Sequence, residues 1–230
     1  MNKRWANRIA VGALWLCGLT TVAVLGAVIV YVFVRGIGQI TPEFIFTRPH
    51  GVNAEGGIGP TIVATIYVTG LAMLIVTPIA VLAAVYLAEY AVQGRLVNTI
   101  RFAADTLASV PSIVLGLFGF ALFYETMGLG FSVLSGALAL SFLMLPIVMR
   151  ATEEAIRAVP RFIRWGSYGL GASKWQTVSR IVLPSAMPRI LTGLILAMGR
   201  AVGETAVVIF TMGEAINMPI SPLDSGRSMT

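Results

Sequence analysis

Residues 61–88 read TIVATIYVTGLAMLIVTPIAVLAAVYLA, an apolar run without a charged side chain. A helix of about 20 residues crosses the roughly 30 Å hydrocarbon layer of a membrane, so this run is long enough to span it. Its residues do not alternate between apolar and polar, which excludes a strand of a membrane barrel. The run is therefore predicted to be a transmembrane helix, because lipid offers no partner to free backbone amides.

Four further apolar runs of this kind lie on either side of it. They cover residues 9–34, 107–124, 129–149 and 190–212. The composition agrees, since 57% of the 230 residues are hydrophobic and only 11% are charged. The predicted fold class is an all-α, polytopic integral membrane protein with five spans. Because residues 216–230 end in a polar sequence without a returning helix, a sixth span is expected to be missing at the C-terminus.

The basic residues predict the orientation of these spans. If five helices alternate, one side of the membrane receives twelve of the sixteen Lys and Arg residues, and the other receives Arg35, Arg48 and Arg227. The positive-inside rule then places the N-terminus and the loop between the fourth and fifth spans in the cytoplasm. The charges are dispersed over loops and form no aromatic-interleaved patch, so nucleic acid is not predicted as a partner.

Residues that could carry catalysis or bind a metal are scarce. His50 is the only histidine and Cys17 the only cysteine, so no metal site can be assembled around them. A phosphate-binding loop needs Lys between Gly and Ser or Thr, but Lys174 is followed by Trp175. We therefore predict no enzyme activity, no cofactor and no metal.

Trp165 to Pro184, reading WGSYGLGASKWQTVSRIVLP, is the polar and basic interruption between the last two spans. Pro160 is predicted to open one short helix that ends before Gly171. Ser173 is predicted to cap a second helix that Pro184 stops. Two readings follow from these residues alone: the pair of helices docks a cytoplasmic partner, or it lies on anionic headgroups.

Nine residues separate Gly171 from Ile181, and Leu183 and Pro184 follow, a pattern that resembles the cytoplasmic EAA loop of permeases in ATP-binding-cassette importers. In that alignment Trp165, Gly166 and Ser167 stand where the family has Glu-Ala-Ala. The stretches GGIGPTIVATIYV, AVYLAEYA, SVPSIVLGLFG and GRAVGETAVVIFT are similar to permeases of bacterial phosphate-specific importers. The last of them resembles the A-type subunit, because the C-type partner usually has Met after the Thr.

The resemblance implies a type I ABC importer permease fold, with residues 1–230 forming one transmembrane domain and a coupling loop at about 150–188. The residues it implies for coupling to an ATPase are Trp165, Gly166, Ser167, Gly171, Ile181, Leu183 and Pro184. It also implies the partners: a C-type permease, two ATPase subunits and an external phosphate-binding protein, in the bacterial inner membrane.

Arg200 and Glu204 are charged residues inside the fifth predicted span, which makes them candidates for the substrate pathway. A spacing of four places them on one helix face. Arg200 is then expected to donate hydrogen bonds to a phosphate oxyanion, and Glu204 is expected to hold or screen the Arg200 guanidinium between turnovers. The alternative is an internal ion pair that only fixes helix packing. Arg150 is either a second pathway contact or a positive-inside anchor.

Other features leave alternatives open. Gly199 and Gly203 have the spacing of a close helix contact, and Pro78, Pro111 and Pro146 predict kinks or hinges in spans two to four. A permease for molybdate or sulfate is the alternative substrate assignment. A membrane scaffold without transport is the alternative from a different class.

Overall fold

The computed structural model describes residues 3–50, 55–215 and 218–229. The chain divides into two compact units, residues 1–59 and residues 60–230. Each unit is considered by itself.

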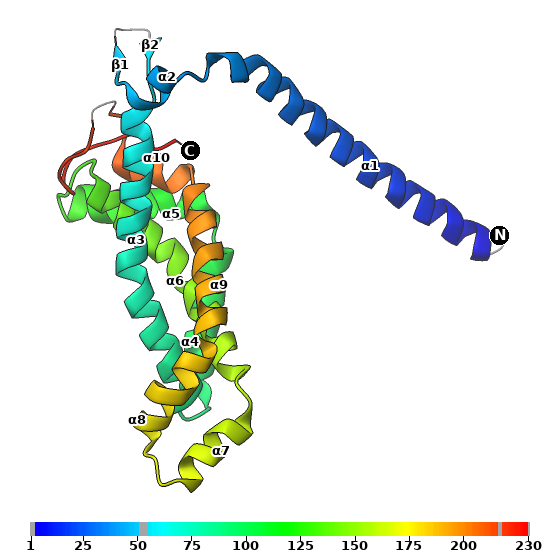
Figure 1. Ribbon diagram of the computed structural model, residues 1–230, viewed down its shortest axis with the longest axis vertical. Helices are drawn as coiled ribbons and strands as arrows, with labels where there is room; N and C mark the ends of the chain where they lie inside the picture. Colours follow the sequence, from blue (N-terminus) through cyan, green and yellow to red (C-terminus); the bar gives the residue numbers. More distant parts are fainter. Residues whose placement is uncertain (1–2, 51–54, 216–217, 230) are drawn as a thin grey trace. The chain divides into compact units, whose positions relative to one another are not determined.

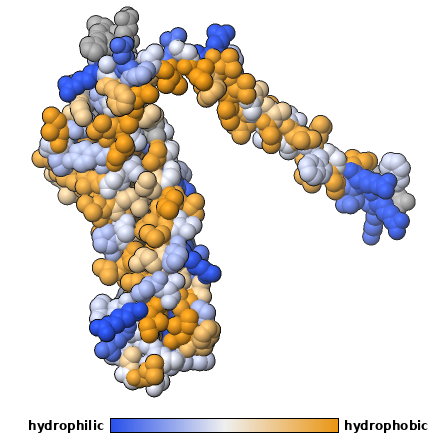
Figure 2. Space-filling view, in the orientation of Figure 1, coloured by the Kyte–Doolittle hydropathy of each residue, from blue (hydrophilic) through white to orange (hydrophobic). Residues whose placement is uncertain are grey.

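The first unit is dominated by α1 (Lys3–Gly36), whose 34 residues confirm the predicted first span. A 3₁₀ turn at Ile37–Gln39 and the short α2 (Pro42–Phe46) follow. The strands β1 (Pro49–His50) and β2 (Glu55–Gly56) then pair antiparallel. Figure 2 shows apolar side chains along α1 and hydrophilic ones at its N-terminal end. The large apolar side chains of α1 are exposed within the unit, as expected for a helix surrounded by lipid.

The second unit is built on three long helices, α3 (Gly59–Val85), α6 (Val133–Arg157) and α9 (Leu183–Val202), which run along its length (Figure 1). Small residues on α3 let α6 approach closely, and the hydroxyl of Ser141 donates to the Ala72 carbonyl at 3.2 Å. Val68, Leu140 and Met144 are almost fully buried in the core between the helices. The predicted second and fourth spans are thus confirmed as helices.

The predicted third span, residues 107–124, crosses a sharp bend. It is divided between α4 (Arg95–Ser109) and α5 (Ser112–Gly119), which a π-helical turn extends to Thr126. The two parts meet at 99°. Pro111 causes the break, since the residue before a proline is driven out of the helical region, and Val110 is extended with ψ 133°. The described residues therefore hold four helices long enough to cross a membrane, or five if this bent pair counts as one span.

The predicted end of a helix at Pro184 is wrong. Helical structure is continuous from Lys174 to Val202, through α8 (Lys174–Thr177), a π-helical turn (Val178–Val182) and α9. Proline breaks an α-helix because it lacks an N–H and its ring clashes with the carbonyl four residues earlier. The N–H of Leu183 instead reaches back five residues to the carbonyl of Val178. This wider turn carries the helix past Pro184.

The predicted fifth span, residues 190–212, is also interrupted. The helix α9 ends at Val202, and α10 (Ala206–Met212) begins after a short break. The described C-terminal residues then cover the start of α6. There the N–H groups of Val133 and Leu134 donate to the carbonyls of Asp224 and Pro222, which satisfies two free amides of the first helical turn.

Candidate functional site

A knob formed by residues 161–182 lies at the end of the second unit opposite α10 (Figure 1). It contains α7 (Arg161–Gly169), α8 and the π-helical turn that follows. Gly171 turns the chain between the two helices with φ +81°, a conformation that favours glycine. Ser173 then starts α8 with a capping box, because its hydroxyl accepts from the Gln176 N–H and its own N–H donates to the Gln176 side chain. The predicted starts of both helices are confirmed.

A hydroxyl pair holds the two helices of the knob together. The side chains of Ser167 and Thr177 are 2.8 Å apart and buried. A buried polar pair of this kind fixes geometry, since separating it would leave both hydroxyls without a partner. Ser167, predicted as a coupling residue, therefore has its side chain inside the knob.

The outer surface of the knob is apolar and exposed. Trp165 is 67% exposed, and Phe162, Trp175 and Leu170 are exposed to a similar or greater extent. Among the other predicted coupling residues, three are exposed and two are half-buried; these are Gly166, Gly171 and Pro184, then Ile181 and Leu183. Large apolar side chains gathered at one tip are typical of a surface that binds another protein.

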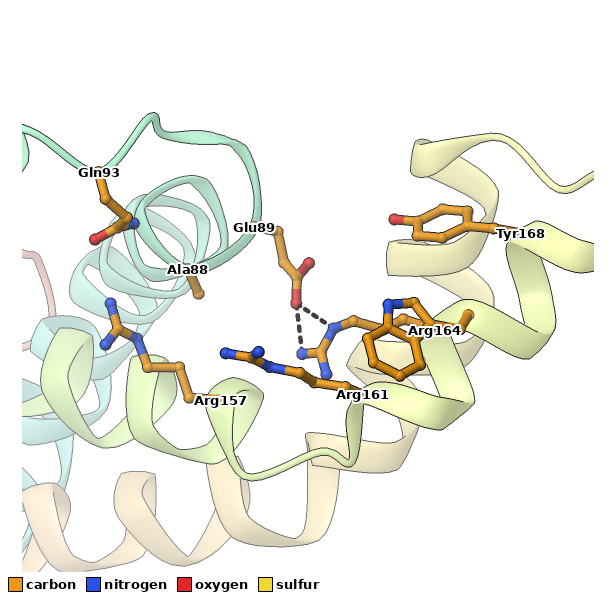
Figure 3. Close-up of a pocket in the computed structure, with 8 residues that line it drawn as sticks. Ala88, Glu89, Gln93, Arg157, Arg161, Arg164 and Tyr168 are labelled. Atoms are coloured by element: carbon orange, nitrogen blue, oxygen red, sulfur yellow. Dashed lines mark hydrogen bonds and ion pairs between the residues drawn. The ribbon is translucent and has the colours of Figure 1, made fainter.

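Arg164 attaches this knob to the ends of α3 and α6. Its guanidinium donates to Glu89 at 2.6 and 3.0 Å (Figure 3) and to the carbonyls of Val159 and Ile156 at 2.6 and 2.8 Å. The Arg164 and Glu89 side chains are only 15% and 9% exposed. Glu89 lies in the π-helical turn Tyr86–Tyr90 that ends α3.

A second contact reaches the same turn. The ammonium group of Lys174, on α8, lies 4.9 Å from the centre of the Tyr90 ring, a distance that suits a cation–π interaction. Both helices of the knob thus contact the end of α3. The sequence alone does not predict this arrangement. The available signal was a carboxylate at the end of an apolar run, which is costly unless a cation pairs with it.

The predicted pathway residues Arg200 and Glu204 do not lie on one continuous helix. Arg200 is exposed near the end of α9, whereas Glu204 is 9% exposed and lies in the break before α10. The helix ends between them because Gly203 leaves the helical conformation, with ψ 5°. The break places a buried carboxylate and an exposed guanidinium at one helix end.

Arg150, the third predicted pathway residue, lies within α6 and forms an ion pair with Asp105 of α4. Both side chains are about half exposed. Asp105 is therefore paired with a guanidinium group. Arg150 and Arg200 lie on helices that are long and apolar enough to cross a membrane. A charge on such a helix is costly against lipid and normally faces a water-filled cavity or a partner helix.

No group of three or more His, Cys, Asp or Glu side chains that could hold a metal occurs among the described residues. The side chain of His50 lies outside them.

The second unit thus combines helices long enough to cross a membrane with an exposed apolar knob at one end. Residues 77–230 match the family of binding-protein-dependent transport system inner membrane components. This match covers more than half of the chain and includes every candidate residue discussed above. The chain belongs to this family and is a multi-pass inner membrane protein.

Individual relatives narrow the comparison. The chain is 39% identical over 213 residues to a probable ABC transporter permease protein, YqgI, of Bacillus subtilis, covering 93% of this chain and 72% of that protein. It is 38% identical over 226 residues to the phosphate transport system permease protein PstA 1 of Mycobacterium tuberculosis, covering 96% and 74%. The PstA protein of Haemophilus influenzae is 35% identical over 203 residues, covering 88% and 68%.

Proposed function

We propose that this protein is a permease subunit of an ATP-driven importer for inorganic phosphate. The observation that carries the phosphate assignment is 38% identity over 96% of the chain to a permease named for phosphate transport. The chain would form half of the translocation pathway and hydrolyse no ATP itself. Its partners would be a C-type permease, two copies of an ATPase and an external phosphate-binding protein.

The knob is proposed to be the cytoplasmic coupling segment, within a loop of about 150–188 in a single permease domain of residues 1–230. Its exposed Trp165 and Phe162 supply an apolar surface for the ATPase. Arg164 and Lys174 attach the knob to the end of α3. A displacement of the knob by ATP-driven closure of the ATPase pair would therefore be passed to α3, which biases the bundle between inward and outward access.

Arg200 is proposed to contact phosphate in the pathway. Its guanidinium group can donate two parallel hydrogen bonds to tetrahedral oxygens. Glu204, buried at the same helix end, would limit the positive field and keep binding weak enough for release. Arg150 is proposed as a second contact whose charge Asp105 partly neutralises.

Uptake of radiolabelled phosphate into vesicles that hold the complete complex tests this function. Arg200→Gln should lower uptake about tenfold or more while the subunits still assemble, since a charge-assisted hydrogen bond contributes about 1.5–3 kcal/mol. Arg189→Gln is the matched control, because Arg189 is also exposed on α9 but lies near its other end. Loss of assembly in Arg200→Gln would favour a packing role for Arg200 instead.

A competition experiment distinguishes phosphate from molybdate and sulfate as the substrate. Excess unlabelled phosphate should abolish uptake of the label, whereas molybdate and sulfate at the same concentration should not. Strong competition by molybdate or sulfate would mean that the competing anion is the substrate in place of phosphate. Uptake at the full rate without the ATPase would refute the coupling role of the knob.

A further inference from the structure

A basic pocket lies beside the Arg164–Glu89 ion pair, outside the proposed pathway. Its volume is about 580 Å³, and it opens between the end of α3 and the junction of α6 with α7. Figure 3 shows Arg157, Arg161 and Arg164 facing the helix end that carries Ala88 and Glu89. Trp165 contributes an aromatic wall.

The carboxylates near this pocket do not balance its cations. Glu89 is occupied by Arg164, at 2.6 Å. Glu153 lies 2.7 Å from Arg157 but also 2.7 Å from Arg101, so two guanidinium groups share one carboxylate.

Arg161 is exposed, and the described part of the chain provides no ion pair to it. Together with Arg101, Arg157 and Arg164 it outnumbers the two carboxylates, which leaves an excess of two positive charges around the pocket. Clustered guanidinium groups repel one another unless an anion lies between them.

The chemistry of the lining selects the class of anion. The planar guanidinium group binds tetrahedral oxyanions such as phosphate through two parallel hydrogen bonds. The volume exceeds that of a phosphate group and leaves room for a small polar substituent. Basic pockets between membrane helices on the cytoplasmic side are suited to lipid headgroups, with aromatic side chains at the same level.

We propose that this pocket binds a phosphate-type oxyanion between Arg157 and Arg161. The anion comes from the headgroup of an anionic phospholipid or from free inorganic phosphate, and both present the same oxygens. Because Arg157 belongs to α6 and Arg161 to α7, the bound anion also ties the knob to the bundle. The site does not depend on which solute the permease carries.

Binding to the purified full chain tests the proposal with two probes. Phosphatidylglycerol is added to the protein in detergent, with phosphatidylcholine as the comparison, and retained lipid is counted by native mass spectrometry. Inorganic phosphate is titrated separately at constant ionic strength, with the midpoint of thermal unfolding as the readout, since a ligand of the folded state raises it. The variants are Arg161→Gln and the control Arg180→Gln, which removes the same charge from an exposed position of the knob outside the pocket.

At least one probe should bind the unaltered chain, and Arg161→Gln should weaken that binding about tenfold while Arg180→Gln leaves it unchanged. Binding of phosphatidylglycerol alone identifies a lipid site, and binding of inorganic phosphate alone identifies a solute site. The proposal is overturned if neither probe binds, or if both variants weaken binding equally, because the effect is then only general surface charge. Neither result bears on uptake, so the proposed transport function is tested separately.

Discussion

Arg164 makes four hydrogen bonds from one largely buried side chain, two to Glu89 and two to carbonyls near the end of α6. Because the carbonyls at a helix end have no partner within the helix, this guanidinium completes α6 as well as neutralising Glu89. Its neighbour Arg161, three residues earlier on the same helix, is exposed. Arg164 therefore carries a charge with a structural role, whereas the charge of Arg161 lies at the surface.

Arg164→Ala should lower the free energy of unfolding by about 3–5 kcal/mol, because it leaves the Glu89 carboxylate buried without its cation. Arg161→Ala is the matched control and should stay within about 0.5 kcal/mol of the unaltered chain. Unfolding in mixed micelles, followed by circular dichroism, measures both. Equal losses in the two variants would mean that the Glu89 pair contributes nothing beyond surface charge.

Sequence alone predicted some of these residues and not others, for a physical reason. Gly171 and Ser173 were predicted as turn and cap because backbone conformation and capping depend on adjacent residues. The partner of Arg164 could not be predicted, since Glu89 is 75 residues away in the chain. The inward position of Ser167 depends in the same way on its contact with Thr177.

At the scale of elements, composition predicted where helices form but not where they bend. The apolar run 107–124 looks uniform, yet Pro111 divides it at 99°. Proline was recognised there as a possible kink, but its angle depends on packing in the bundle. The break after Val202 has no proline to mark it in the sequence.

The contact between α6 and α9 also differs from the sequence prediction. Gly199 and Gly203 were expected to allow a close helix approach, but a Cβ added at Gly199 would meet nothing within 4 Å, and at Gly203 only backbone carbonyls of α9. The close approach is at Gly193, where an added Cβ would lie 2.7 Å from the Cβ of Ala151. A helix pair needs a small residue only where the two surfaces meet.

Gly193→Ala should therefore lower the free energy of unfolding of the isolated chain by about 1–3 kcal/mol, because the two helices must separate to make room. Gly199→Ala should cause no loss, since alanine favours a helix by about 0.8–1 kcal/mol over glycine. The same unfolding assay compares them. A larger loss in Gly199→Ala than in Gly193→Ala would show that α6 and α9 do not meet at Gly193.

At the scale of the whole molecule, the spans and the knob together define a topology. The second unit places the knob and the C-terminal segment 218–229 at opposite ends of its bundle (Figure 1). The knob packs on the end of α3 through Glu89 and Tyr90. If α1 and α3 are consecutive spans, we expect the N-terminus of α1 on the same side of the membrane as the knob. The excess of Lys and Arg predicts that this side is cytoplasmic.

Cysteine labelling in intact cells tests this topology, in a chain whose only cysteine is removed by Cys17→Ser. Arg227→Cys should react with a membrane-impermeant maleimide added outside, because Arg227 is exposed in the C-terminal segment. Lys3→Cys and Lys174→Cys should react only after the membrane is permeabilised. Outside labelling of Lys174→Cys would put the knob beyond the reach of a cytoplasmic ATPase, which removes the mechanical basis of the proposed function. If only Lys3→Cys reacted with maleimide added outside, the predicted orientation of α1 in the membrane would be reversed. The proposed coupling role of the second unit would not be affected.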